Sequence, residues 1–83
     1  MTFPYKSINF NQHMNYKTCT FEELTNHTSH TIDWAEKNLH DSHKSRAAMV
    51  NETVGYFLGV CAVRAFDYDF KKVEAWREIA FNN

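Results

Sequence analysis

The histidines are the residues in this chain whose spacing best matches a metal-binding site. His27 and His30 form one pair three residues apart, and His40 and His43 form a second pair. Side chains three residues apart share one face of a helix, so either pair can bring two imidazoles to one Zn²⁺ ion. Four ligands require the chain to reverse direction between the pairs. In a single helix over residues 21–40 the first pair faces solvent, so exposed histidines without a metal are the favoured interpretation.

The two cysteines are the other side chains that could supply chemistry. Cys19 precedes the expected start of a helix, where the helix dipole favours a thiolate. Cys61 lies in an apolar stretch, where burial raises the thiol pKa and makes the group inert. No histidine adjoins either residue in sequence, so we expect neither to be a nucleophile. The start of the sequence, MTFPYKSINF, lacks the pattern of a secretory signal, which predicts free thiols and a cytoplasmic location.

Composition and motifs exclude several classes of protein. The sequence has no Gly-rich phosphate loop, no G-x-S-x-G elbow and no HExxH pair, so we expect neither an enzyme nor a cofactor. Nine Lys and Arg against ten Asp and Glu give a net charge of -1, whereas nucleic-acid binders usually carry a basic excess. A DNA-binding regulator is an alternative, with phosphate contacts from Lys44 and Arg46 at one helix start and Lys71 and Lys72 at another.

These side chains must be positioned by helices, because the chain has 16% aromatic residues and only two Gly and one Pro. We predict one small all-α domain of three helices over residues 20–83, preceded by an N-terminal arm over residues 1–19. The alternating apolar residues of the arm indicate extended chain or a short β-hairpin. A single helical turn from Ser7 is the alternative.

The ends of the helices are indicated by capping residues. Thr20 and Glu23 match a capping box, which predicts a helix to about residue 40. The poor helix formers of TNHTSHT allow a break near residues 28–30. A second helix starts after Ser42 or Ser45 and continues to about residue 66. Asp69 is expected to cap the third helix, over residues 69–81. Its predicted apolar face comprises Phe66, Phe70, Val73, Ala80 and Phe81, with Trp76 to one side.

The stretch VGYFLGVCAV, residues 54–63, makes the second helix apolar nearly all round. A membrane span needs about 20 apolar residues, so this stretch is too short to cross a membrane. Its glycines, Gly55 and Gly59, share one face of the helix. Glycine in a helix interior costs about 1 kcal/mol relative to alanine, so we expect both to allow close packing of another helix.

Two neighbouring helices cannot cover every side of such a helix. The predicted uncovered interface comprises Trp34, Met49, Tyr56, Val60, Val63 and Ile79. Burial of each large apolar side chain contributes about 1.5–3 kcal/mol, against an association cost of about 4–15 kcal/mol. The N-terminal arm, a second copy of the chain and a different protein are the three alternative occupants.

The sequence therefore predicts a small, non-enzymatic regulator or inhibitor that binds another protein through an apolar helical face. A homodimeric assembly module is the main alternative. Frequent Asn, Lys, Phe, Tyr and Ile are typical of an AT-rich genome, which favours a phage-encoded protein of the host-takeover, anti-defence or lysis-timing type.

Overall fold

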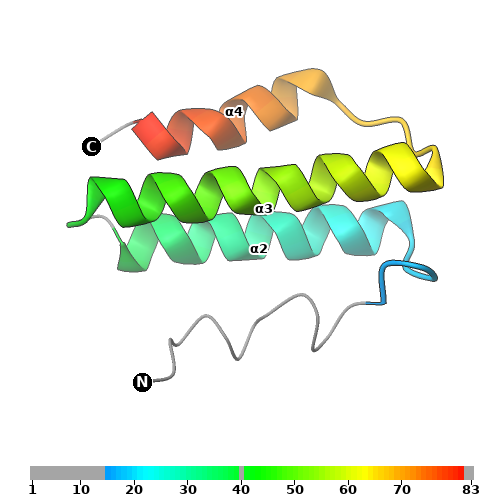
Figure 1. Ribbon diagram of the computed structural model, residues 1–83, viewed down its shortest axis with the longest axis horizontal. Coiled ribbons are helices and arrows are strands. Elements are labelled where there is room, and N and C mark those ends of the chain that lie inside the picture. The colour runs from blue at the N-terminus through cyan, green and yellow to red at the C-terminus, as the bar shows by residue number, and fades with distance from the viewer. Residues whose placement is uncertain (1–14, 40, 82–83) are drawn as a thin grey trace.

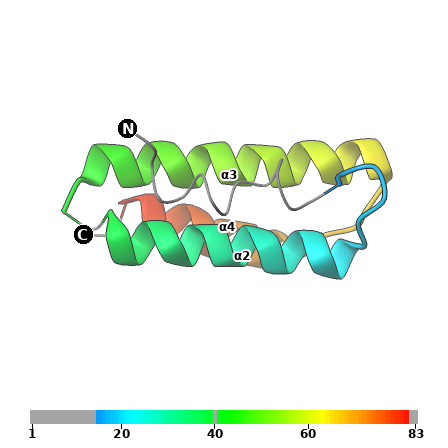
Figure 2. The ribbon, with the colours of Figure 1, turned by 90° about the horizontal axis from the view of Figure 1, so that it is seen from below.

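Three helices make up most of the described chain. The computed structural model describes residues 15–39 and 41–81, with α2 over Phe21–Asn38, α3 over His43–Arg64 and α4 over Phe70–Phe81. Successive helices run antiparallel, and α3 lies between α2 and α4 in the view of Figure 1. Seen from below, α2 and α4 lie together on one side of α3 (Figure 2), and all three helices contact one another. The all-α prediction is confirmed, while the predictions for residues 1–14 lie outside the described residues.

The predicted caps define where the helices begin. The Thr20 hydroxyl accepts a hydrogen bond of 3.0 Å from the Glu23 N–H, and the Glu23 carboxylate accepts one of 2.8 Å from the Thr20 N–H. This reciprocal pair confirms the capping box. Ser42, rather than Ser45, caps α3 by accepting from the Ser45 N–H. Asp69 caps α4, because its carboxylate accepts a bond of 2.9 Å from the Lys71 N–H.

The helix α2 has no break near residues 28–30, where its poor helix formers allowed one. Thr28 Oγ1 donates to the Leu24 carbonyl oxygen at 2.8 Å, and Thr31 Oγ1 donates to that of His27 at 3.0 Å. Both hydroxyls are therefore satisfied within the helix itself. Threonine can be buried in α2 without a partner from another element.

The helix α3 ends two residues earlier than predicted. Ala65 adopts the left-handed conformation, with φ 58° and ψ 40°, and its N–H donates to the Cys61 carbonyl oxygen. The Phe66 N–H donates to the same oxygen at 2.9 Å. Glycine usually occupies this left-handed position, so an alanine there gives no sequence signal that the helix stops.

The core is formed where the three helices meet. Phe57 of α3 packs edge-to-face on Trp76 of α4, with ring centroids 5.0 Å apart. Around this pair lie the other buried apolar residues, namely Cys19, Leu24, Ile32, Ala35, Val50, Val54, Cys61, Val73 and Ala80. Burial of each larger side chain contributes about 1.5–3 kcal/mol. The core thus holds α2 and α4 together against one side of α3.

The helix α4 presents a different face to the core from the one predicted. Trp76 is 7% exposed, whereas Phe70 and Phe81 are 60% and 67% exposed. Val73 and Ala80 are buried as predicted. Trp76 at the centre of α4 points at Phe57, which turns both terminal phenylalanines outward.

The buried Arg46 contradicts the alternative in which this residue contacts nucleic-acid phosphates. Its side chain is 2% exposed, and its Nε donates a hydrogen bond of 3.0 Å to the Ile79 carbonyl oxygen. Arg46 is therefore a structural link between α3 and α4. Within the described ranges, no helix is both long enough and apolar enough to cross a membrane.

Candidate functional site

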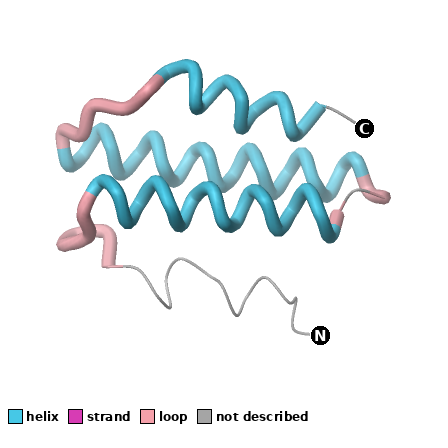
Figure 3. Tube along the Cα trace, turned by 180° about the vertical axis from the view of Figure 1, so that it is seen from behind, coloured by secondary structure: helices cyan, strands magenta, loops and turns pink. Residues whose placement is uncertain are grey.

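An open groove of about 630 Å³ lies along the side of α3 that faces away from α4. A turn of residues 15–19 forms its other wall, at the end of the molecule where α3 stops and α2 starts (Figure 3). The groove is lined by Tyr16, Lys17, Glu52, Gly55, Tyr56, Gly59, Val60, Val63 and Arg64. Lining residues from α3 thus share one helical face.

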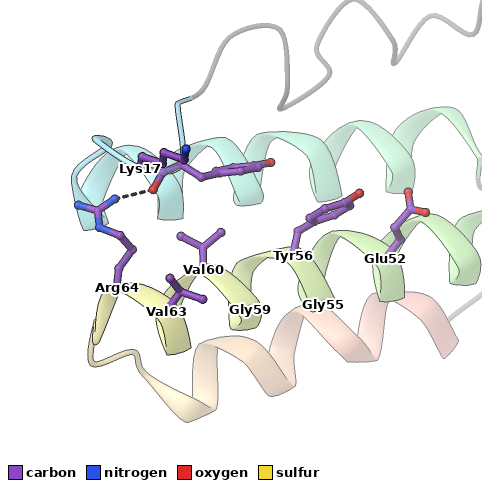
Figure 4. A pocket seen from close by; sticks show the side chains of 9 residues that line it. Lys17, Glu52, Gly55, Tyr56, Gly59, Val60, Val63 and Arg64 are labelled. Carbon is purple, nitrogen blue, oxygen red and sulfur yellow. Dashed lines mark hydrogen bonds between the residues drawn. The ribbon is translucent and has the colours of Figure 1, made fainter.

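The turn is attached to α3 by one arginine. Arg64 Nη1 donates a hydrogen bond of 2.6 Å to the Tyr16 carbonyl oxygen, drawn as a dashed line in Figure 4. The same nitrogen lies 3.8 Å from the Cys19 sulfur, and the guanidinium lies 4.7 Å from the centroid of the Phe66 ring. Because Arg64 contacts a main-chain oxygen, the wall of the groove is held at its peptide backbone.

The two glycines form the floor of the groove. Gly55 and Gly59 are both exposed, and a Cβ atom added to either would meet no described atom within 4 Å. No described helix packs on these glycines, so the close packing of another helix on them stays a prediction. The reason is the placement of α2 and α4, which both lie on the other side of α3. Among residues 15–39 and 41–81, nothing covers the glycine face of α3.

Two tyrosines form an aromatic wall beside the glycines. The rings of Tyr16 and Tyr56 are stacked, with centroids 6.4 Å apart and an interplanar angle of 23°. Burial raises the pKa of the Tyr16 hydroxyl well above its ordinary value, and the neighbouring Tyr56 and Cys19 raise it further. The Tyr16 hydroxyl therefore stays protonated at neutral pH, and this wall carries no charge from it.

The charged residues of the groove are separated by sign. Lys17 and Arg64 lie at one end, Glu52 lies at the other, and both glycines lie between them (Figure 4). Lys17 and Glu52 are exposed. A ligand along the groove would therefore meet positive charge at one end and negative charge at the other.

The predicted interface residues do not form one surface. Tyr56, at 49% exposed, and Val63, at 86% exposed, line the groove together with Val60. The other three, Trp34, Met49 and Ile79, are partly buried and pack against the core. Each of these three side chains is half-buried, as Val60 is, but none of the three lines the groove. The groove thus brings together Tyr56, Val60 and Val63 from the predicted interface, and Met49 of α3 is not among its lining residues.

The histidines do not converge in the described part of the chain. His30 and His43 are exposed and His27 is partly buried, whereas His40 lies outside the described residues. Across residues 15–39 and 41–81, no group of three or more His, Cys, Asp or Glu side chains could hold a metal ion. Geometry there gives no support to the alternative of a histidine metal site.

Both cysteines are buried free thiols. Burial raises the pKa of the Cys61 thiol, and the nearby Cys19 raises it further. Cys61 thus has the inert surroundings that its apolar stretch predicted. Cys19 Sγ lies 3.9 Å from the Tyr16 carbonyl oxygen, at the base of the turn.

Sequence reasoning missed the half of the groove that lies outside the apolar pattern. Tyr16 and Lys17 come from the segment assigned to the arm, and Glu52 and Arg64 are polar. A search for charged residues on the same helical face as Gly55 and Gly59 would have found Glu52. Nothing in the sequence places the turn of residues 15–19 against α3.

Comparison of the chain with protein-family models, with curated proteins and with solved structures gives no match.

Proposed function

We propose that this protein is a non-enzymatic regulator or inhibitor that binds a helix of another protein in the α3 groove. The observation that carries the proposal is the open glycine floor, where neither Gly55 nor Gly59 has a described atom within 4 Å of its added Cβ. An exposed tyrosine and two valines border this floor.

The glycines have no explanation among the described contacts. Neither has a positive φ, so the backbone does not require glycine at either position. Each lowers the stability of α3 by about 1 kcal/mol relative to alanine. A remaining reason for glycine in a helix is the close approach of a second helix from outside, as small residues four apart permit. A helix is therefore the ligand that fits this floor.

The shape and charge of the groove define the chemistry of that helix. A small residue on the ligand would face Gly55 and Gly59, and flanking apolar residues would cover Tyr56 and Val60. An acidic residue would lie toward Lys17 and a basic residue toward Glu52. This is an amphipathic helix docked in a groove, with charges that fix its direction.

The energetics favour a reversible complex. Burial of three fully exposed side chains of this kind would contribute about 4.5–9 kcal/mol, against an association cost of about 4–15 kcal/mol. The gain here is smaller, because Tyr56 and Val60 are already partly covered and only Val63 is almost fully exposed. Tyrosine is also enriched among the residues that dominate binding energy. Tyr56 is therefore expected to be the main anchor.

The test is a display selection of random amphipathic helices on the full chain. The selection uses the unmodified chain alone. The selected helices are then measured against Gly59→Leu, which fills the floor, and against Ala75→Leu on the exposed side of α4 as the matched control. Selected helices should bind Gly59→Leu at least about tenfold more weakly, which is 1.4 kcal/mol, and should bind the control normally. Selection of no helix, or equal binding to Gly59→Leu, would rule out the proposal.

A further inference from the structure

The groove face is complementary to itself. It has opposite charges at its two ends and small residues at its centre. In a two-fold dimer each copy uses the same surface, so a face can pair with itself only if a rotation brings complementary groups together. The arrangement of Glu52, Lys17 and Arg64 meets this condition for one orientation.

We propose that a second copy of this chain occupies the groove when no partner is bound, through an antiparallel pair of α3 helices. The pair would cross between Gly55 and Gly59, so that each Gly55 faces Gly59 of the other copy. Glu52 of each copy would then lie at the Lys17 and Arg64 end of the other copy.

The positions along α3 agree with this arrangement. Gly55 and Gly59 are centred on position 57, and Glu52 and Arg64 are centred on position 58. The two centres differ by one residue, or about 1.5 Å along the helix axis. Long charged side chains absorb a shift of that size. One two-fold axis therefore serves both the glycine contact and the charge contacts.

The charges exclude the parallel arrangement. In a parallel pair of α3 helices, Glu52 would face Glu52 and the Lys17 ends would lie together, which places like charges opposite each other. The antiparallel pair brings each exposed Glu52 toward an exposed Lys17 instead. Charge complementarity thus selects the second copy and also its direction.

Self-association would regulate the groove. The inference rests on the proposed function, because a dimer that buries the groove competes with the partner helix for the same surface. By mass action, a rise in the concentration of the chain favours the dimer and lowers the fraction of open grooves. The dimer is then an autoinhibited form. A partner helix binds the monomer and so shifts the equilibrium from dimer to monomer.

The experiment is analytical ultracentrifugation of the full chain, up to a concentration of about 1 mM. Glu52→Lys and Lys17→Glu should each raise the dimer dissociation constant by about tenfold or more, since each reverses two symmetric contacts. The variant that combines both substitutions should dimerise more tightly than either single variant, and its recovery should be partial because Arg64 keeps its positive charge. Gly59→Leu should abolish the dimer, and Ala75→Leu should leave it unchanged.

Several outcomes would overturn the inference. A monomer throughout this range would do so, and the proposed function would still stand if selected helices bound the groove. If neither charge reversal nor Gly59→Leu changes the dimer dissociation constant, the dimer uses another surface. If the unmodified chain is monomeric, a variant that combines Phe3→Ser, Tyr5→Ser, Ile8→Ser and Phe10→Ser is measured over the same concentrations. A dimer of that variant would identify the leading segment, in place of a second copy, as the occupant of the groove.

Discussion

Arg46 Nε, near the start of α3, donates a hydrogen bond to the main-chain carbonyl oxygen of Ile79, near the end of α4. The last four carbonyl groups of a helix have no partner within it, and Ile79 belongs to this set. A side chain that reaches it from another helix therefore serves as a cap for α4. The bond also joins the ends of the two helices farthest from the α3–α4 loop.

Replacement of Arg46 by methionine should destabilise the fold. Arg46→Met keeps the apolar stem but leaves the Ile79 oxygen without this donor, which costs about 1–3 kcal/mol in the free energy of unfolding. Urea denaturation measures the loss, and hydrogen exchange should show it first in the last turn of α4. Arg77→Met, at an exposed position of α4, should change stability by less than about 0.5 kcal/mol. Equal effects of the two substitutions would contradict the capping role.

Alanine at either floor glycine should stabilise the monomer. Gly55→Ala and Gly59→Ala should each raise the free energy of unfolding by about 0.5–1 kcal/mol, because the new Cβ meets no described atom. Urea denaturation at low protein concentration measures this effect, with Ala75→Gly as a control that should lower stability by a similar amount. The same alanines should weaken association through the groove. A loss of monomer stability would show that the floor is already occupied.

Stability should fall in alkaline solution. Burial raises the pKa of Tyr16 above its ordinary 10.0 and that of Cys61 above its ordinary 9.0. As pH rises through these values the unfolded chain loses protons that the folded chain keeps, so the free energy of unfolding declines. The decline should begin above about pH 9 and steepen above about pH 10.

A tyrosine substitution separates the contributions to that decline. Tyr16→Phe should flatten the curve above pH 10, since no hydroxyl remains at position 16 to ionise. Urea denaturation at a series of pH values gives both curves. A Tyr16→Phe curve that runs parallel to that of the unmodified chain would refute the assignment.

The face of α4 that is buried can be tested with two aromatic residues. Trp76→Ala should cost about 3–5 kcal/mol because Trp76 is 7% exposed and packs on Phe57. Phe70→Ala should cost less than about 0.5 kcal/mol because Phe70 is 60% exposed. Thermal or urea denaturation compares the two variants. A larger loss of stability for Phe70→Ala than for Trp76→Ala would show that the face predicted from the sequence pattern is the buried one.

The helices could be predicted from sequence because their starts depend on local chemistry. Thr20 and Asp69 each act on main-chain groups within three residues, so short patterns contain the information. The end of α3 could not be predicted, because the left-handed Ala65 depends on how the chain turns toward α4. The inward face of α4 was predicted in part, because the helical period places Val73 and Ala80 inward. The burial of Trp76 in place of Phe70 and Phe81 depends on packing against Phe57.

The groove was predictable only in part for the same reason. Tyr56, Val60 and Val63 were expected at an uncovered face from the helical period of α3 alone. Tyr16 and Lys17 were not, because they reach the groove through the bond between Arg64 and a main-chain oxygen. Any residue at position 16 offers that oxygen, so no residue type there predicts the contact.

The left-handed alanine after α3 has a practical consequence for measuring this molecule. An alanine in that conformation costs roughly 1–2 kcal/mol that glycine avoids, and Ala65 is exposed and does not line the groove. Ala65→Gly should therefore yield a sturdier parent chain with unaltered recognition surfaces. Damaging replacements such as Trp76→Ala could be purified and compared on that reinforced background, which tolerates a larger loss of stability.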